Sequence, residues 1–403
     1  MTAEEGADAL ALPAGAVWPD YGEGGLFGLI RSCRRFLRGE NWSFAGGDAE
    51  PGAEPGEAGK VLVLLLVDGL GDDFLQRFGA GSALLAHRRG RLTSVFPSTT
   101  ASAVTTVMTG LTPARHGLTG WFIRDERCGG ILAPLPLSLR AGSALEAGQV
   151  VEELFPYPTL YEKAARASRL VSPREIAWSP FSKRHARGAR IAGYGAGLEG
   201  LRQELRRAVL ELNAMGGGFV YAYYPRFDSI SHEFGSRSAE AVEEFRRVDA
   251  AFERLLAELQ GLSCDVLLTA DHGFADASPE RTVHLEAYPQ LQALLECPLW
   301  GERRVAFCAV KPGREAEFEA LASEALVGKA VVHPSARLVE AGLFGPGERH
   351  PRLAERVGTH ALLMEEGWIV MDQLPGEKPY WLTGVHGGLS AQEMHIPLIH
   401  ARC

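Results

Sequence analysis

Apolar and polar residues follow two periods along this chain, one typical of strands and one typical of helices. The seven apolar residues Val61–Val67 predict a strand that is buried on both faces. Shorter apolar segments predict further strands at 92–96, 169–172, 219–224 and 266–269. Each of these segments has the four to eight residues that are usual for a strand in a globular domain.

Segments with helical spacing lie between these predicted strands. Apolar residues recur every three or four positions from Phe245 to Leu259, with Glu and Arg on the other face, and a shorter pattern of the same kind runs from Leu201 to Leu212. Strands that alternate with helices indicate an α/β fold: a doubly wound, mostly parallel sheet with helices on both faces.

A second pattern begins after residue 303. It predicts a strand at 305–310, the helix Glu315–Ala325 and a strand at 330–333, which together indicate a small α+β subdomain inserted into the larger domain. The chain is then expected to return to the larger domain near Trp381.

The segment before the larger domain has a different composition. Helical spacing at Leu26–Leu37 predicts one packed helix, and the residues at 46–59, rich in Gly, Pro and Glu, predict a loop. We therefore expect three parts: an N-terminal arm at 1–57, a core at 58–275 and 380–403, and an inserted cap subdomain at 276–379.

Composition narrows the class of protein. The 403 residues are 46% apolar and 23% charged, as in ordinary globular proteins, and the net charge of −9 argues against stable binding to nucleic acid or to anionic lipid. The run of seven apolar residues is far short of the ~20 that span a bilayer. The first residues, Met-Thr-Ala-Glu-Glu, lack the pattern of a secretory signal, so we expect a cytoplasmic protein. Six scattered cysteines without a Cys-x-x-Cys pair disfavour a thiolate zinc cluster and a disulfide scaffold.

Two candidate sites follow predicted strands in the first third of the chain. Asp68 comes directly after Val61–Val67, at the end of the strand where ligands bind in open α/β sheets, although an Asp-Gly turn would look the same. Hydroxyl residues at 98–100 lie where a strand passes into a helix. The unpaired N–H groups and dipole of a helix N-terminus favour an oxyanion or a phosphate there, and ordinary capping is the alternative.

Three further clusters carry carboxylates and imidazoles. Asp228 and His232 are four residues apart, a spacing that places both on one face of a helix and lets them hold one metal ion. Asp271 and His272 end the predicted strand at 266–269, and His386 lies in a Gly-rich turn. Each cluster alone could be a cap or a turn. Their recurrence at successive strand ends predicts one shared site.

The order of these motifs resembles the alkaline phosphatase superfamily and, within it, the type I phosphodiesterase and nucleotide pyrophosphatase family. The window from Phe96 to Leu111, Phe-Pro-Ser-Thr-Thr through Met-Thr-Gly-Leu, matches that family's nucleophile window without gaps. The nucleophilic threonine of the family then falls on Thr100, with Thr99 as the alternative. The likeness runs from about residue 60 to the C-terminus.

The resemblance implies two divalent metal ions, usually zinc, each bound by a mixture of imidazole and carboxylate. The first would be held by Asp228, His232 and His386. The second would be held by Asp68, Asp271, His272 and the Thr100 oxygen.

The sequence departs from the family pattern beside the nucleophile. The family usually has Lys just before the nucleophile and Asn three residues after it, and here these positions are Thr99 and Ala103. The missing Asn removes a donor to the phosphoryl oxygens. We expect Arg226, two residues before Asp228, to be the substrate-binding cation.

These observations predict a metal-dependent phosphohydrolase that cleaves phosphodiester or nucleotide pyrophosphate bonds in a small-molecule phosphoester or nucleotide. Two alternatives remain. One is a phosphomonoester or phosphonate hydrolase of the same superfamily, and the other is a non-catalytic binding protein that keeps this fold.

Overall fold

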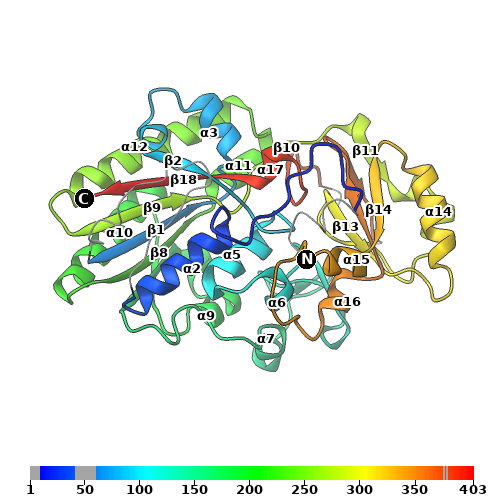
Figure 1. Ribbon diagram of the computed structural model, residues 1–403, viewed down its shortest axis with the longest axis horizontal. Coiled ribbons are helices and arrows are strands. Elements are labelled where there is room, and N and C mark those ends of the chain that lie inside the picture. The colour runs from blue at the N-terminus through cyan, green and yellow to red at the C-terminus, as the bar shows by residue number, and fades with distance from the viewer. Residues whose placement is uncertain (1–9, 41–59, 375–376, 378–379) are drawn as a thin grey trace.

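The computed structural model describes residues 10–40, 60–374, 377 and 380–403. The loop predicted at 46–59 lies outside the described residues. Figure 1 shows a large sheet with its helices at the left and a smaller sheet at the right.

The large sheet has seven strands in the order β2-β18-β9-β1-β8-β6-β7. From β9 to β7 each strand is parallel to its neighbour, whereas β18 is antiparallel to both β9 and β2. In that order the strands span Arg88–Thr93, His395–Arg402, Cys264–Thr269, Val61–Val67, Gly218–Tyr224, Ser168–Pro173 and Arg190–Tyr194. All seven residues of β1 are buried because strands lie on both sides of it and helices cover both faces. The predicted α/β class is confirmed.

Helices flank both faces of this sheet (Figure 1). The helices that pack closely on one another include α2 with α5 and α10 with α12. On one face, Leu65 and Val67 of β1 lie against Leu201 of α10 and Phe252 of α12. The helices up to residue 259 are α2 (Leu26–Leu37), α3 (Asp72–Phe78), α4 (Ala83–Ala86), α5 (Thr100–Thr109), α6 (Pro113–His116), α7 (Gly148–Leu154), α8 (Arg174–Ala177), α9 (Pro180–His185), α10 (Gly197–Ala214), α11 (Arg226–Phe234) and α12 (Ala239–Leu259).

Two strands at one edge of the sheet differ from the prediction. The strand expected at 92–96 is instead β2, which ends at Thr93, because the chain leaves the sheet where Ser94 N–H donates to the Met394 carbonyl. The last strand, β18, was not predicted. It inserts between β2 and β9 and brings the end of the chain back into the large sheet.

The smaller sheet has four antiparallel strands in the order β12-β13-β15-β14. Side chains of β13 alternate between its faces, so that Val305 and Phe307 pack with Phe96 and Phe344, and Ala306 and Cys308 pack under α14. These elements are β12 (Trp300–Gly301), β13 (Val305–Cys308), β14 (Ala330–Pro334), β15 (His360–Met364), α14 (Glu315–Ala325), α15 (Ser335–Glu340) and α16 (Leu353–Val357).

Three further sheets, each of two or three short strands, accompany the large sheet and the smaller sheet. A three-stranded sheet lies next to β12, and two strand pairs, β10 with β17 and β11 with β16, join segments about 90 to 110 residues apart. Their bounds are β3 (Ile123–Asp125), β4 (Gly130–Ala133), β5 (Ser138–Leu139), β10 (Ala275–Asp276), β11 (Thr282–His284), β16 (Ile369–Met371) and β17 (Gly384–Val385). The remaining helices are α13 (Pro289–Gln292) and α17 (Ala391–Met394). Among the described residues, none of the helices combines the length and the apolar character that crossing a bilayer requires.

Candidate active site

The predicted site residues meet at the carboxyl ends of three neighbouring strands. Asp68 follows β1, and Asp271 and His272 follow β9. On the other side of β1, strand β8 leads into α11, which carries Asp228 and His232. Because β9, β1 and β8 are adjacent and parallel, their ends converge at one edge of the sheet.

His386 reaches the same edge from a distant part of the chain. It follows β17, and β17 pairs with β10, the strand directly after the Asp271-His272 turn. The His386 and His272 rings stack with centroids 3.7 Å apart. The following residue, Gly387, has a φ of +112°, which a side chain would strain. The backbone of this Gly-rich turn therefore requires a glycine directly after His386.

One group of ligand atoms lies on the α11 side. His232 Nε2 is 3.3 Å from Asp228 Oδ1 and 3.3 Å from His386 Nε2. His386 Nε2 is 3.8 Å from Asp228 Oδ1. Three atoms that can each donate an electron pair thus face one small volume.

A second group lies on the β9 side. His272 Nε2 is 3.4 Å from Asp68 Oδ1 and 3.5 Å from Asp271 Oδ2. The Thr100 hydroxyl oxygen is 3.2 Å from His272 Nε2 and 3.5 Å from Asp68 Oδ1. His272 also lies within 4.8 Å of ligand atoms of Asp228 and His386, so the two groups adjoin.

Hydrogen bonds around the site orient the imidazoles. His232 Nδ1 donates to the Gly384 carbonyl at 2.8 Å, and His272 Nδ1 donates to the Gly273 carbonyl at 3.0 Å. A ring whose Nδ1 carries the proton presents an unprotonated Nε2, which is the form that binds a metal. Both Nε2 atoms point into the site.

Two buried carboxylate oxygens in the site, Asp228 Oδ1 and Asp271 Oδ2, have no hydrogen-bond donor among the described residues. Burying a carboxylate oxygen without a partner is unfavourable, and a bound cation would supply the missing partner. Imidazole mixed with carboxylate suits divalent zinc and its neighbours among the metals. The residues present therefore fit two metal ions.

The pKa values agree with this interpretation. Burial raises the pKa of Asp68 well above its ordinary value, and repulsion by Asp271 and Asp228 raises it further. Burial and repulsion by Asp271 also raise the pKa of Asp228. Burial lowers the pKa of His232 to about 4 and holds that of His386 well below its ordinary value. The site thus favours neutral imidazoles, and cations would relieve the repulsion among its carboxylates.

Thr100 is the first residue of α5. The N–H groups of a first helical turn have no intrahelical acceptors and carry a partial positive charge. Thr99, the alternative nucleophile, is completely buried, and its hydroxyl donates to Glu302 Oε1 at 2.5 Å. Of the two hydroxyls, only that of Thr100 faces the ligand groups.

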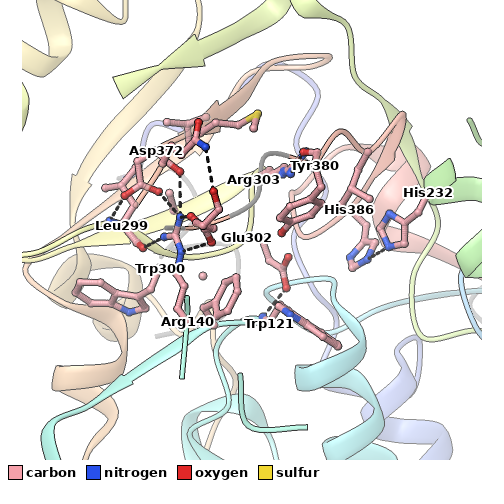
Figure 2. Close-up of a pocket in the computed structure, with 18 of the residues that line it drawn as sticks. Trp121, Arg140, His232, Leu299, Trp300, Glu302, Arg303, Asp372, Tyr380 and His386 are labelled. Carbon is pink, nitrogen blue, oxygen red and sulfur yellow. Dashed lines mark hydrogen bonds and ion pairs between the residues drawn. The ribbon is translucent and has the colours of Figure 1, made fainter. Parts of the chain in front are cut away.

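A cavity of about 450 Å³ opens from this cluster toward the smaller sheet. Figure 2 shows His232 and His386 at one end, Arg140 and Asp372 at the other, and Glu302 between them. The four aromatic residues of its wall are Trp121, Phe122, Trp300 and Tyr380. This is the size and lining typical of a small-molecule site.

Sequence reasoning missed five charged residues of this cavity: Arg140, Glu302, Arg303, Asp372 and Glu377. Arg140 is held by ion pairs to Asp372 at 2.8 Å and Glu377 at 3.0 Å. The Arg303 guanidinium lies 4.5 Å over the Tyr380 ring. Glu302 enters from the turn between β12 and β13. No motif marks these residues, because they join the site only through packing of the smaller sheet on the larger domain.

Arg226 does not join the group, contrary to the prediction that it binds substrate. Its side chain is 62% exposed, and its guanidinium lies 3.5 Å from Glu244 of α12. It stands at the start of α11, and the residues that line the cavity do not include it. The helix directs Asp228 and His232 inward and leaves Arg226 on the outer side.

Comparisons with known proteins agree with this geometry. The model of a family described as type I phosphodiesterase / nucleotide pyrophosphatase matches residues 62–389. Curated protein sequences yielded no match.

Solved structures of ectonucleotide pyrophosphatase / phosphodiesterase 5 have a similar fold. The murine protein has a TM-score of 0.62 and 17% identity, over 84% of this chain and 87% of its own. An inactive variant of the murine protein, in complex with AMP, has a TM-score of 0.62 and 18% identity, over 85% and 87%. The human protein has a TM-score of 0.60 and 16% identity, over 84% and 87%.

The family match spans most of the chain, from the second residue of β1 to just beyond the His386 turn. It therefore includes every strand end that contributes to the site. The chain belongs to the type I phosphodiesterase / nucleotide pyrophosphatase family, and it is a hydrolase of phosphoric ester bonds.

Proposed function

We propose that this enzyme cleaves the phosphodiester or pyrophosphate bond of a small nucleotide or related phosphoester, with Thr100 as the nucleophile and two divalent metal ions, zinc by preference. The observation that carries the proposal is the position of the Thr100 hydroxyl. It lies at the N-terminus of α5, 3.2 Å from His272 Nε2, and it lines the substrate-sized cavity.

The metals would occupy the two groups of ligand atoms. Asp228, His232 and His386 would hold the first, and Asp68, Asp271, His272 and the Thr100 oxygen would hold the second. When bound, such ions lower the pKa of a coordinated hydroxyl and neutralise charge on the phosphoryl group.

The chain itself positions the nucleophile. Loss of the hydroxyl proton makes Thr100 Oγ1 an anion, which the positive end of α5 stabilises. Attack on phosphorus forms the P–Oγ1 bond as the bond to the leaving group breaks, and the leaving group departs with the electron pair and takes up a proton from solvent, to which the hydroxyl proton was lost. Water then cleaves the P–Oγ1 bond of the phosphothreonine, which frees the phosphate product and restores the hydroxyl. The Tyr223 hydroxyl donates to Asp68 Oδ2, which orients that carboxylate beside Thr100.

A nucleotide substrate is supported by the murine relative in complex with AMP, which is an inactive variant with alanine in place of a threonine. The cavity of this chain also suits a nucleotide, because aromatic walls provide stacking surfaces for a flat base.

A matched pair of variants tests the assignment of the nucleophile. Thr100→Val and Thr99→Val both exchange a hydroxyl for a methyl group. We expect Thr100→Val to lower kcat for an aryl phosphodiester by about a thousandfold or more, with bound metal retained. Thr99→Val should lower kcat much less. The reverse ranking would show that Thr99 is the nucleophile.

A further inference from the structure

Glu302 places a carboxylate on the cavity wall beside the nucleophile. Its Oε1 accepts hydrogen bonds from the Thr99 hydroxyl at 2.5 Å and from Trp121 N–H at 2.6 Å. Thr99 directly precedes Thr100. Gly387 lies on the other side of Glu302. A Cβ at Gly387 would lie 2.7 Å from Glu302 Cβ, so only a glycine next to His386 leaves room for the Glu302 side chain. Glu302 is thus held between the nucleophile and a proposed metal ligand.

The charge of Glu302 is not neutralised by an ion pair within the part of the chain that the structure describes. Glu377 in the same cavity differs, because both of its carboxylate oxygens accept hydrogen bonds from Arg140. Arg303 follows Glu302 in the chain, but its guanidinium stacks on Tyr380 and donates to the Tyr380 carbonyl at 2.9 Å. Burial accordingly raises the pKa of Glu302 to about 7, against the opposing effects of Thr99, Trp121 and Arg303.

We propose that Glu302 determines specificity for substrate charge, so that the enzyme disfavours dianionic phosphomonoesters relative to monoanionic phosphodiesters. The inference rests on the proposed function, since it concerns the phosphoryl group that Thr100 would attack. On this proposal, a residue outside the two metal groups discriminates between phosphodiesters and phosphomonoesters.

The physical basis is repulsion between like charges on a wall that water screens poorly. Coulomb energy is proportional to the charge of the substrate, so a fixed carboxylate repels a dianion about twice as strongly as a monoanion. If loss of the Glu302 charge raises kcat/KM for a diester by some factor, it should raise kcat/KM for a monoester by about the square of that factor. An unfavourable contact with the wrong substrate is a common source of specificity.

The test compares two aryl esters with the same leaving group, a methyl aryl phosphodiester and the aryl phosphomonoester, at a pH of about 8.5 where Glu302 is ionised. Glu302→Gln keeps the acceptor for Thr99 and Trp121 and removes the charge. We expect the diester-to-monoester ratio of kcat/KM to fall at least about tenfold, equal to ~1.4 kcal/mol. Glu302→Asp, which keeps the charge, should retain a ratio close to that of the wild type.

Glu377→Gln is the matched control, because it removes a carboxylate of the same cavity that lies beside Arg140, at the end of the cavity away from the metal groups. The diester-to-monoester ratio of kcat/KM of Glu377→Gln should stay within about twofold of that of the wild type. A fall of less than about threefold in Glu302→Gln, or an equal fall in the control, would overturn the inference. If Glu302→Gln does not fold, Glu302→Ala is judged by the same criterion. Failure of the proposed function would look different, since the wild type would then not hydrolyse the diester at all.

Discussion

Replacing Glu393 by Gln removes one charge from a buried ion pair that joins the two histidine turns of the site. Glu393 Oε2 accepts from Arg304 Nη2 at 2.9 Å, and both side chains are 1% exposed or less. Glu393 Oε1 accepts from Gly388 N–H, two residues after His386, at 2.8 Å. The Glu393 backbone carbonyl accepts from Gly273 N–H, next to His272, at 2.8 Å.

The expected cost follows from leaving a buried charge without its partner. Breaking a buried ion pair by removing one member typically costs about 3–5 kcal/mol. Glu393→Gln keeps one acceptor, so we expect about 3 kcal/mol, and Arg304→Met should cost a similar amount because it leaves the carboxylate unpaired. The double variant leaves no unpaired charge. Its cost should therefore be smaller than the sum of the two single costs by ~2 kcal/mol.

Solution pH provides a second check on this ion pair. Burial alone would raise the pKa of Glu393, but attraction by Arg304 and hydrogen bonds from Arg304, Ser390 and Gly388 hold it below its ordinary value. A carboxyl whose pKa is lowered in the folded state stabilises the protein above its unfolded pKa, which for Glu is about 4.3. That contribution is lost as the pH falls through the folded pKa. The cost of Glu393→Gln should therefore shrink below a pH of about 4.

The assay is urea unfolding followed by circular dichroism, with excess chelator so that metal binding does not contribute. Wild type, both single variants and the double variant complete the cycle. Arg314→Met is the control, because Arg314 and Glu317 form an exposed pair whose loss should leave the midpoint unchanged. Additive costs in the cycle, or a cost below about 1 kcal/mol for Glu393→Gln at pH 7, would refute the reasoning.

Two further predictions concern the metals and the surface. Chelation should abolish hydrolysis of a phosphodiester and lower the melting temperature, because ions at 100 times their Kd stabilise the native state by about 2.7 kcal/mol, and added Zn²⁺ should restore both. Activity that survives with metal content verified as nil would contradict the metal assignment. Arg226→Ala should change kcat/KM by less than about twofold, since its guanidinium lies against Glu244 and away from the cavity. A tenfold loss in the same assay would restore Arg226 as a substrate-binding residue.

The local sequence pattern was sufficient to predict those helices and strands whose own residues decide which face is buried. The predicted bounds of α2, β1 and α14 agree with the structure to the residue. In α2 and α14 the apolar residues recur at helical spacing, and in β1 they form a continuous run, so each segment buries its apolar residues in the predicted conformation.

The edge of the large sheet could not be predicted in the same way. β2 has the sequence Arg-Arg-Gly-Arg-Leu-Thr, with only two buried residues, so it carries little strand signal. It forms because β18, some 300 residues later, supplies its hydrogen-bond partners. Pairing of this kind depends on the whole chain being folded.

The residues of the candidate site also fall into two sets, those that local sequence places and those that contacts between distant segments place. Asp68, Asp271 and His272 directly follow predicted apolar strands, and Asp228 and His232 share one helix face, so local sequence was enough to bring them to one edge of a sheet. The direction of Arg226 was decided by Glu244 on the neighbouring helix. Glu302 lies 203 positions from Thr99 and reaches it only because the β12–β13 turn packs into the cavity.

The sequence by itself therefore determined which residues end the strands of the core and what chemistry they carry, because strand periodicity and the parallel sheet place those ends together. Only the tertiary structure decided the shape and charge of the cavity above them. The walls of that cavity come from Trp121, Arg140, Glu302 and Tyr380, which belong to segments with no shared period or motif. Such residues meet through the packing of one sheet on another, and contacts between distant segments leave no local pattern in a single sequence.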